Sequence, residues 1–268
     1  YPFNAIISME EKQYALVTGA SSGMGWCYAQ ALANRGYNLV IVSNEETIYE
    51  RAQNIAQQHP TLEVQPILMN LATPTAAKEL FNLCQQHHWE VEVLVNNAGV
   101  YHDRDFLNDS EDFNQLILYL HIFTPTMLGY YFGQQMVTRH KGYVLNMSSI
   151  TDRIAIQRMG TYGATKAFLT AHTRALHIEW KQQGVYVTTV RPGAVDTGLC
   201  SISPAATRIG KALGYIVSPE YLVRRALNGL FRGRAVVSVP RVWNALLLAV
   251  IACIPTALLR LIRRLHIF

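Results

Sequence analysis

The stretch Thr18-Gly19-Ala20-Ser21-Ser22-Gly23-Met24-Gly25 follows a short apolar run, residues 14–17, and precedes a segment of helical character. Glycine is needed where the backbone takes a positive φ or lies directly against a ligand. The first turn of a helix offers unpaired N–H groups and the positive end of the helix dipole to a pyrophosphate. The stretch therefore predicts a turn between a strand and a helix that binds the phosphates of a nucleotide cofactor.

Apolar, β-branched runs recur along the chain with helical segments between them. The runs cover residues 14–18, 39–42, 64–69, 91–95, 143–147, 185–190 and 235–239. Near-continuous apolar runs are typical of parallel strands that are covered on both faces. Thr73-Pro74 and Ser218-Pro219 each place a capping residue before proline, as at a helix start. We predict one α/β domain over residues 10–240, a Rossmann-like doubly wound parallel sheet of about seven strands.

The composition indicates a globular protein with no metal centre. Half of the 268 residues are hydrophobic, which is enough for a large core. The four cysteines form no CxxC pair, and the nine histidines show no metal-ligand spacing. This cysteine usage suits a reducing compartment. Because the first eight residues lack the basic and apolar regions of a secretory signal, we expect a cytoplasmic protein.

Basic charge is concentrated towards the C-terminal end. The formal net charge is +5, and residues 208–268 contain ten Lys or Arg against one acidic residue. These charges flank an apolar run, a pattern that argues against a nucleic-acid partner. The uninterrupted apolar part of residues 241–268 is shorter than the about 20 residues of a spanning helix. We expect an apolar, basic helical extension that contacts a membrane surface peripherally, or one that packs over the substrate entrance or in a subunit contact.

Tyr162 and Lys166 are four residues apart, a spacing that puts both on one face of a helix. A phenol has a pKa near 10, and a nearby ammonium group lowers that pKa. Tyr162 is therefore a candidate general acid for a carbonyl oxygen that accepts a hydride, or a general base in reverse. Ser149, which follows the apolar run 143–147, can donate a hydrogen bond to the same oxygen, and Ser148 competes for that role.

With these motifs the chain resembles the short-chain dehydrogenase/reductase family in its classical form. The resemblance runs from about residue 12 to about residue 240 and rests on the glycine-rich turn, Asn96-Asn97-Ala98-Gly99, Ser149, Tyr162-x-x-x-Lys166 and Pro192-Gly193-x-Val195-x-Thr197. It implies a nicotinamide dinucleotide and a homodimer or homotetramer that pairs helices 111–140 and 162–181. The family places its serine about thirteen residues before the tyrosine, which selects Ser149.

The resemblance also implies which residues contact the cofactor. Lys166 hydrogen-bonds the nicotinamide ribose, and Asn70 and Leu71 border the adenine. The complete expected set is Thr18, Gly19, Ser21, Ser22, Gly23, Met24, Gly25, Ser43, Asn44, Asn70, Leu71, Asn97, Ala98, Gly99, Tyr162, Lys166, Pro192, Gly193, Val195 and Thr197.

His121 departs from the family pattern. Many members have an asparagine in the long helix before the serine strand, where it holds a water that relays protons to the lysine; His121 occupies the matching position. Imidazole can donate and accept through its two nitrogens. We hypothesise that His121 takes part in catalysis by holding this water or relaying directly; a histidine packed between helix and sheet is the equal alternative.

The residues after the second apolar run bear on the choice of cofactor. A carboxylate there pairs with the ribose 2′-OH and repels a 2′-phosphate, whereas a nearby arginine accommodates that phosphate. Ser43 and Asn44 can hydrogen-bond a phosphate without repelling it, while Glu45 is acidic. The sequence therefore favours NADP(H) and leaves NAD(H) open.

The segment Asp196 to Val217 falls where the family folds a lid over its substrate, and it is rich in apolar residues and poor in charge. We therefore expect an oxidoreductase that acts on a ketone or secondary alcohol of an apolar, lipid-like or steroid-like substrate. The alternative is a dinucleotide-sensing binding protein of the same fold without catalysis, which would not need Ser149, Tyr162 and Lys166.

Overall fold

The computed structural model describes residues 12–101, 104–154, 157–196 and 204–252. At its centre is a seven-stranded sheet in which neighbouring strands are parallel. The strands are β1 (Gln13–Thr18), β2 (Asn38–Ser43), β3 (Val64–Leu68), β4 (Glu90–Asn96), β5 (Gly142–Met147), β6 (Val185–Pro192) and β7 (Val236–Val239), in the spatial order β3-β2-β1-β4-β5-β6-β7. The predicted doubly wound parallel sheet is confirmed. The strand order reverses between β1 and β4, where folds of this kind bind ligands.

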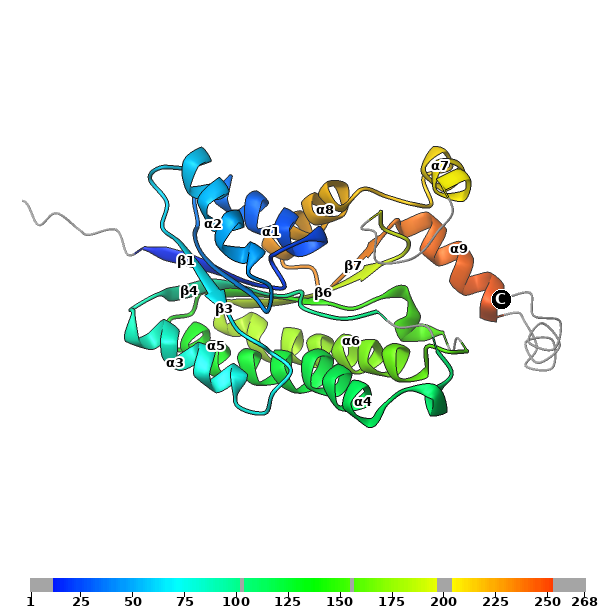
Figure 1. The fold of residues 1–268 in the computed structure, drawn as a ribbon, viewed down its shortest axis with the longest axis horizontal. Coiled ribbons are helices and arrows are strands. Elements are labelled where there is room, and N and C mark those ends of the chain that lie inside the picture. Colours follow the sequence, from blue (N-terminus) through cyan, green and yellow to red (C-terminus); the bar gives the residue numbers. More distant parts are fainter. Residues whose placement is uncertain (1–11, 102–103, 155–156, 197–203, 253–268) are drawn as a thin grey trace, which may run out of the picture.

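Helices cover both faces of this sheet (Figure 1). One face carries α1 (Gly23–Ala33), α2 (Thr47–Gln58) and α8 (Pro219–Phe231), and the other carries α3 (Ala76–Gln86), α4 (Glu111–Leu118), α5 (Thr124–Thr138) and α6 (Gly160–Trp180). Ala15 and Val17 of β1 pack into the first core, and Tyr14 and Leu16 pack into the second. Because successive strand residues face opposite buried layers, the strands need the continuous apolar runs seen in the sequence.

The helix-start signals had different outcomes. Ser218 is the N-cap of α8, and its side chain accepts a hydrogen bond from Tyr221 N, as predicted. The Thr73-Pro74 signal belongs to the turn before α3, which begins at Ala76; the Thr73 hydroxyl accepts from Ala76 N at 3.2 Å. The prediction of a helix start at Thr73 was therefore wrong by two residues, since Thr75 is the N-cap.

The long helix expected over residues 111–140 is interrupted. A π-helical turn, Tyr119–Phe123, lies between α4 and α5, and His121 is at its centre. Such widened turns are rare and are frequent at functional sites. The turn is the local backbone change that positions the His121 side chain.

At the carboxyl end of the sheet lie α7 (Pro204–Ala212) and α9 (Arg241–Ala252), which follows β7 directly (Figure 1). Short 3-10 helices complete the fold at Phe106–Asn108, Ile150–Arg153 and Lys181–Gln183. Residues 253–268, and with them Pro255 and the terminal arginines of the expected extension, lie outside the described residues.

Candidate active site

The glycine-rich turn between β1 and α1 is tied to the end of β4. Thr18 Oγ1 accepts hydrogen bonds from Asn97 N and Ala98 N, each at 3.0 Å, and the Asn97 side chain donates to Thr18 O at 3.0 Å. Gly19 and Gly23 take positive φ values of 66° and 54°. A Cβ added to Gly25 would lie 1.9 Å from Gly19 O. Glycine at these three positions lets the backbone of the turn form a close cradle, which fits the pyrophosphate of a nicotinamide dinucleotide.

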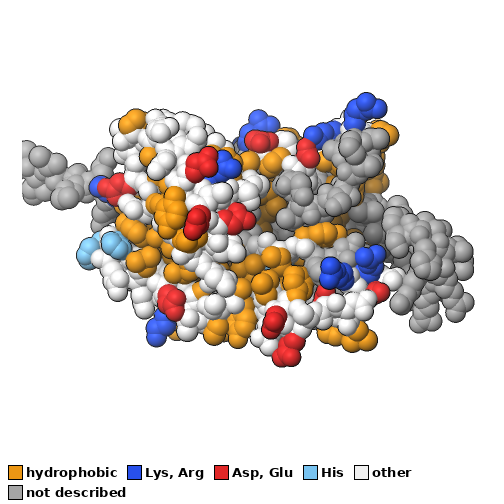
Figure 2. Space-filling view, in the orientation of Figure 1, with side chains coloured by type: hydrophobic (Ala, Val, Ile, Leu, Met, Phe, Trp, Pro, Cys, Tyr) orange, Lys and Arg blue, Asp and Glu red, His pale blue; other side chains and the backbone are white. Residues whose placement is uncertain are grey.

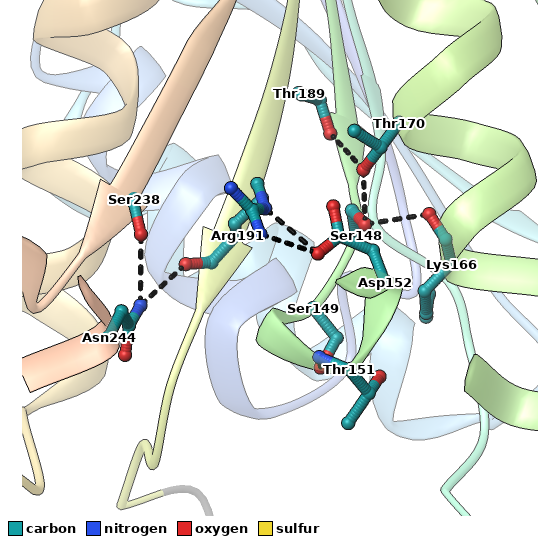
Figure 3. A network of polar contacts seen from close by, with 10 residues as sticks. All are labelled: Ser148, Ser149, Thr151, Asp152, Lys166, Thr170, Thr189, Arg191, Ser238 and Asn244. Carbon is teal, nitrogen blue, oxygen red and sulfur yellow. Dashed lines mark hydrogen bonds and ion pairs between the residues drawn. The ribbon is translucent and has the colours of Figure 1, made fainter. Parts of the chain in front are cut away.

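Two adjacent serines follow β5 and have different surroundings. Ser148 Oγ donates to Lys166 O at 2.9 Å and lies 2.8 Å from Thr170 Oγ1, so its hydroxyl is used in holding α6 against the sheet. Ser149 Oγ accepts from Thr151 N at 3.2 Å, which leaves its hydrogen available for donation. The contacts therefore favour Ser149 over Ser148 as a donor to substrate (Figure 3).

Tyr162 and Lys166 lie in the first two turns of α6. The Lys166 ammonium nitrogen is 5.5 Å from the centre of the Tyr162 ring and donates to Met147 O at 2.9 Å. Burial lowers the pKa of Lys166 to about 7, because the charged form loses its water. The rings of Tyr101 and His121 both approach the Tyr162 ring edge-to-face, at 5.6 and 5.7 Å. This packing restricts the orientation of the phenol.

His121 is buried and both of its ring nitrogens have partners. Val100 N donates to Nε2 at 3.0 Å, and Nδ1 lies 3.1 Å from Thr165 Oγ1. The Thr165 hydroxyl itself donates to Tyr162 O at 2.7 Å, so Nδ1 carries the ring hydrogen and donates to Thr165. Burial, and secondarily the charge of Lys166, lowers the pKa of His121 well below its ordinary value. The imidazole is therefore neutral, with its tautomer determined by its neighbours.

A small cavity of about 10 Å³ lies between the π-helical turn and α6. This is about the room of one water molecule. Asn96, Thr124, His121 and Lys166 are among the residues that line it, and the Asn96 Oδ1 atom is buried without a hydrogen bond among the described residues. The cavity beside His121 therefore has room for one water molecule and polar groups in its walls.

The end of β2 is occupied by a hydrogen-bonded pair of serines. Ser43 Oγ donates to Ser21 Oγ at 3.0 Å, and Glu45 N donates to Ser43 Oγ at 3.2 Å. The Ser43 hydroxyl is consequently engaged within the protein, while Asn44 beside it is exposed. Arg51 Nε of α2 donates to Ser21 O at 3.0 Å. Sequence reasoning missed Arg51, since it lies eight residues beyond Ser43 and no local pattern marks it.

Arg191, which precedes Pro192-Gly193, forms a buried ion pair with Asp152. Its Nη2 and Nε lie 2.6 and 3.0 Å from Asp152 Oδ1 (Figure 3). The two side chains are 6% and 1% exposed. Asp152 belongs to the 3-10 turn that begins after Ser149, so the pair joins the serine loop to β6. Sequence reasoning missed it because the partners are far apart in the chain.

Asn244 of α9 connects the C-terminal helix to this network. Its Nδ2 donates to Arg191 O at 3.2 Å and to Ser238 Oγ at 3.0 Å (Figure 3). A Cβ on Gly193 would lie 2.4 Å from Asn244 Oδ1, so glycine is needed there for the close approach of α9. Trp243 Nε1 donates to Leu213 O at 2.9 Å, which joins α9 to the segment after α7. The first turn of α9 is thus packed against the fold.

The remaining predicted cofactor residues are distributed around the same edge. Ser22 is exposed at the N-cap of α1 and Met24 packs against the core. Asn70 is exposed, and its side chain accepts a hydrogen bond from Ala72 N at 2.9 Å.

Other predicted cofactor residues lie near the small cavity or after β6. Leu71 is buried and lines the small cavity. Gly99 lies against the imidazole, since a Cβ there would be 2.9 Å from His121 Nε2. Pro192 ends β6, Val195 pairs with Val217, and Thr197 lies outside the described residues.

The sequence profile of the short chain dehydrogenase family matches residues 13–205. The chain belongs to this family. Two solved structures share its fold at a TM-score of 0.75 and 26% identity, each over 91% of this chain: the bulky-bulky ketone specific alcohol dehydrogenase from Comamonas testosteroni, of which 95% is covered, and a short-chain dehydrogenase from Sphingobium yanoikuyae in complex with NADPH, of which 96% is covered.

The curated relatives of this short chain dehydrogenase include "Hydroxysteroid dehydrogenase-like protein 1" of Gallus gallus, which is 28% identical over 73% of this chain. They also include "Very-long-chain 3-oxooacyl-coA reductase let-767" of Caenorhabditis elegans, which is 31% identical over 70% of this chain. The match covers 60% and 61% of the length of these two relatives, so the chain spans less than two thirds of either.

Proposed function

We propose that this short chain dehydrogenase transfers a hydride between NADP(H) and the ketone or secondary alcohol of an apolar substrate. The observation that carries the proposal is the approach of Lys166 to Tyr162: the ammonium nitrogen lies 5.5 Å from the centre of the phenol ring and donates to Met147 O, two residues before Ser149. A sensor without catalysis has no need of a buried lysine beside a tyrosine at this place. The family membership supports the same reaction class.

The chemistry divides between cofactor and protein. A bound nicotinamide supplies or accepts the hydride at the carbonyl carbon. In reduction, Tyr162 gives its phenolic proton to the carbonyl oxygen, so that the ketone becomes an alcohol and the phenol becomes a phenolate. Ser149 donates a hydrogen bond to the same oxygen and stabilises the charge that develops on it. Lys166, in its charged form, stabilises the phenolate, because its ammonium nitrogen lies over the Tyr162 ring, 5.5 Å from the ring centre.

The segment 196–217, where the family folds its lid, supports the proposal of an apolar substrate. Ile209 of α7 and Leu213 after it are 58% and 60% exposed. Among the charged groups in the described part of this segment, Lys211 and Asp196 pair with each other, and Arg208 is exposed. The relatives named for hydroxysteroid and very-long-chain 3-oxoacyl substrates point in the same direction.

The test is a panel of apolar ketones and alcohols, including 3-oxoacyl thioesters and steroids, followed at 340 nm with NADPH and NADH separately. We expect turnover of at least one apolar carbonyl with the wild-type chain and none with Tyr162→Phe, while both proteins still bind cofactor. Cofactor binding without turnover of any carbonyl would instead establish the sensing protein.

Homo-oligomer formation belongs to the same proposal. The helices that the family resemblance implicates carry exposed apolar side chains, namely Leu118, Phe123, Tyr130, Phe168 and Ile178. Figure 2 shows hydrophobic side chains among polar ones over the layer of helices that contains α4 and α5. We expect a dimer or tetramer in light scattering, converted to a smaller species by Ile178→Glu. A monomeric wild-type chain would contradict this.

The last part of the proposal is contact with a membrane surface. No helix in the described part of the chain is long and apolar enough to cross a bilayer. Val242 and Leu246 of α9 are 68% and 51% exposed, which leaves an apolar face beside the buried Asn244. We expect the full chain to sediment with anionic vesicles more strongly than a chain that ends near Pro240, which lacks this face. Equal sedimentation would remove membrane contact from the proposal.

A further inference from the structure

Arg51 reaches back from α2 to the glycine-rich turn. Its Nε donates to Ser21 O at 3.0 Å, and its Cζ lies 4.9 Å from the centre of the Trp26 ring. The side chain is half-buried. The hydrogen bond to Ser21 O and the contact with the Trp26 ring thus hold the guanidinium group in place. Less side-chain entropy is then lost when a ligand binds.

The guanidinium group has donors to spare. Nε is used by Ser21 O, and the two Nη groups make no hydrogen bond within the part of the chain that the structure describes. They lie at the turn that also contains the Ser21–Ser43 pair. Ser43 ends β2, the position beside which a dinucleotide fold holds the 2′ position of the adenosine ribose.

The neighbouring residues do not supply a cation at this place. The Ser43 hydroxyl donates to Ser21, and Asn44 is neutral. Glu45 and Glu46 carry negative charge, but both are exposed, so solvent and salt screen their repulsion of a phosphate. Arg51 is less exposed and its planar fork matches phosphate oxygens. Whether the end of β2 attracts a phosphate therefore depends on the positive charge of Arg51.

We propose that Arg51 is the specificity-determining residue of the cofactor site and that its Nη groups bind the 2′-phosphate of NADP(H). This inference rests on the proposed function, since it needs a chain that binds a nicotinamide dinucleotide. The preference for NADP(H) then comes from a residue of α2, outside residues 43–45, on which the sequence-based choice of cofactor rested.

The experiment measures binding without turnover. Dissociation constants for NADPH, NADH, 2′,5′-ADP and 5′-ADP are determined by calorimetry for the wild-type chain, Arg51→Gln and Arg51→Lys. We expect the wild type to prefer NADPH to NADH and 2′,5′-ADP to 5′-ADP. Arg51→Gln should weaken both 2′-phosphorylated ligands by about 10- to 100-fold, the range of a charged hydrogen bond, and change the other two by less than about twofold. Arg51→Lys should lie between, because it keeps the charge and loses the fork.

Arg224→Gln is the matched control. Arg224 also lies over an aromatic ring, with Cζ 5.7 Å from the centre of the Tyr221 ring, and is exposed on α8. It should leave all four dissociation constants unchanged, which excludes a general effect of net charge. Retained NADH binding by Arg51→Gln also shows that the variant is folded.

Three results would overturn the inference. An unchanged ratio of NADPH to NADH affinity in Arg51→Gln would remove Arg51 from the site. An equal loss of all four ligands would show that Arg51 only supports the turn. Failure of the wild-type chain to bind either dinucleotide would overturn the inference and the proposed function together, and so is distinguishable from the first two.

Discussion

His121 Nδ1 lies 3.1 Å from Thr165 Oγ1, and Thr165 in turn donates to the carbonyl oxygen of Tyr162. Because Nε2 accepts from Val100 N, the imidazole joins the loop after β4 to the first turn of α6. A direct proton relay through the ring would have to break one of these bonds. We therefore propose His121 as a positioning residue for Tyr162 beside a one-water cavity, with the sequence-based relay hypothesis as its competitor.

Substitution of His121 separates these roles. His121→Asn, which restores the family's residue, should keep most of the turnover number and the wild-type shape of its pH profile. His121→Ala should lower the free energy of unfolding by about 1–3 kcal/mol, since Val100 N and Thr165 Oγ1 lose a buried partner. Urea unfolding and the pH dependence of kcat check this. A limb of the profile that moves or disappears in His121→Asn would establish the relay; full turnover of His121→Ala at every pH would remove His121 from catalysis.

Lys166 should make stability depend on pH. In the unfolded chain the lysine pKa is near its ordinary value, while burial lowers the folded pKa to about 7. Between these values the unfolded state binds more protons, so the free energy of unfolding rises as the pH increases from 7 to 10. We expect the free energy of unfolding of the wild type, taken relative to that of Lys166→Met, to rise by roughly 3 kcal/mol over that window. Parallel curves for the two proteins would contradict a depressed lysine pKa.

The Arg191–Asp152 pair should be costly to break and much less costly to replace. Arg191→Met leaves a buried carboxylate unpaired and should destabilise the fold by about 3–5 kcal/mol, whereas Asp152→Leu with Arg191→Met should recover most of this. The exposed pair Lys12–Glu63 is the control, and Lys12→Met should change stability by about 0–1 kcal/mol. Urea unfolding measures all four proteins. If the double variant is no more stable than Arg191→Met, the loss has another origin.

Gly25 should not tolerate a methyl group, because its Cβ would collide with Gly19 O in the cradle. Gly25→Ala should therefore abolish binding of NADPH and NADH alike. Gly129 of α5 is the control, since a Cβ there meets nothing within 4 Å and alanine favours a helix. Gly129→Ala should keep cofactor affinity and raise the unfolding temperature. Normal calorimetric binding by Gly25→Ala would contradict the role of the cradle.

Most strands of the fold could be predicted because the pattern that marks each strand lies within that strand's own residues. Strands buried on both faces must be apolar throughout, so the runs that begin at Tyr14, Leu39 and Val91 mark them directly. The Thr73-Pro74 signal failed because a threonine cap can serve a turn as well as a helix, and only the packing of Ala76 and Ala77 against the core decides where the helix starts.

By itself the sequence determined the sheet, the glycine-rich turn and the spacing of Tyr162 and Lys166, since each depends on neighbours within a few residues. Only the tertiary structure decided that Ser148 is held by α6 while Ser149 is not, and that both nitrogens of His121 are engaged. It also decided that Arg51 reaches the glycine-rich turn and that Asn244 reaches the backbone of Arg191. The physical reason is that hydrogen bonds and ion pairs depend on distance in space, and residues such as Arg191 and Asp152 meet only after the sheet has formed.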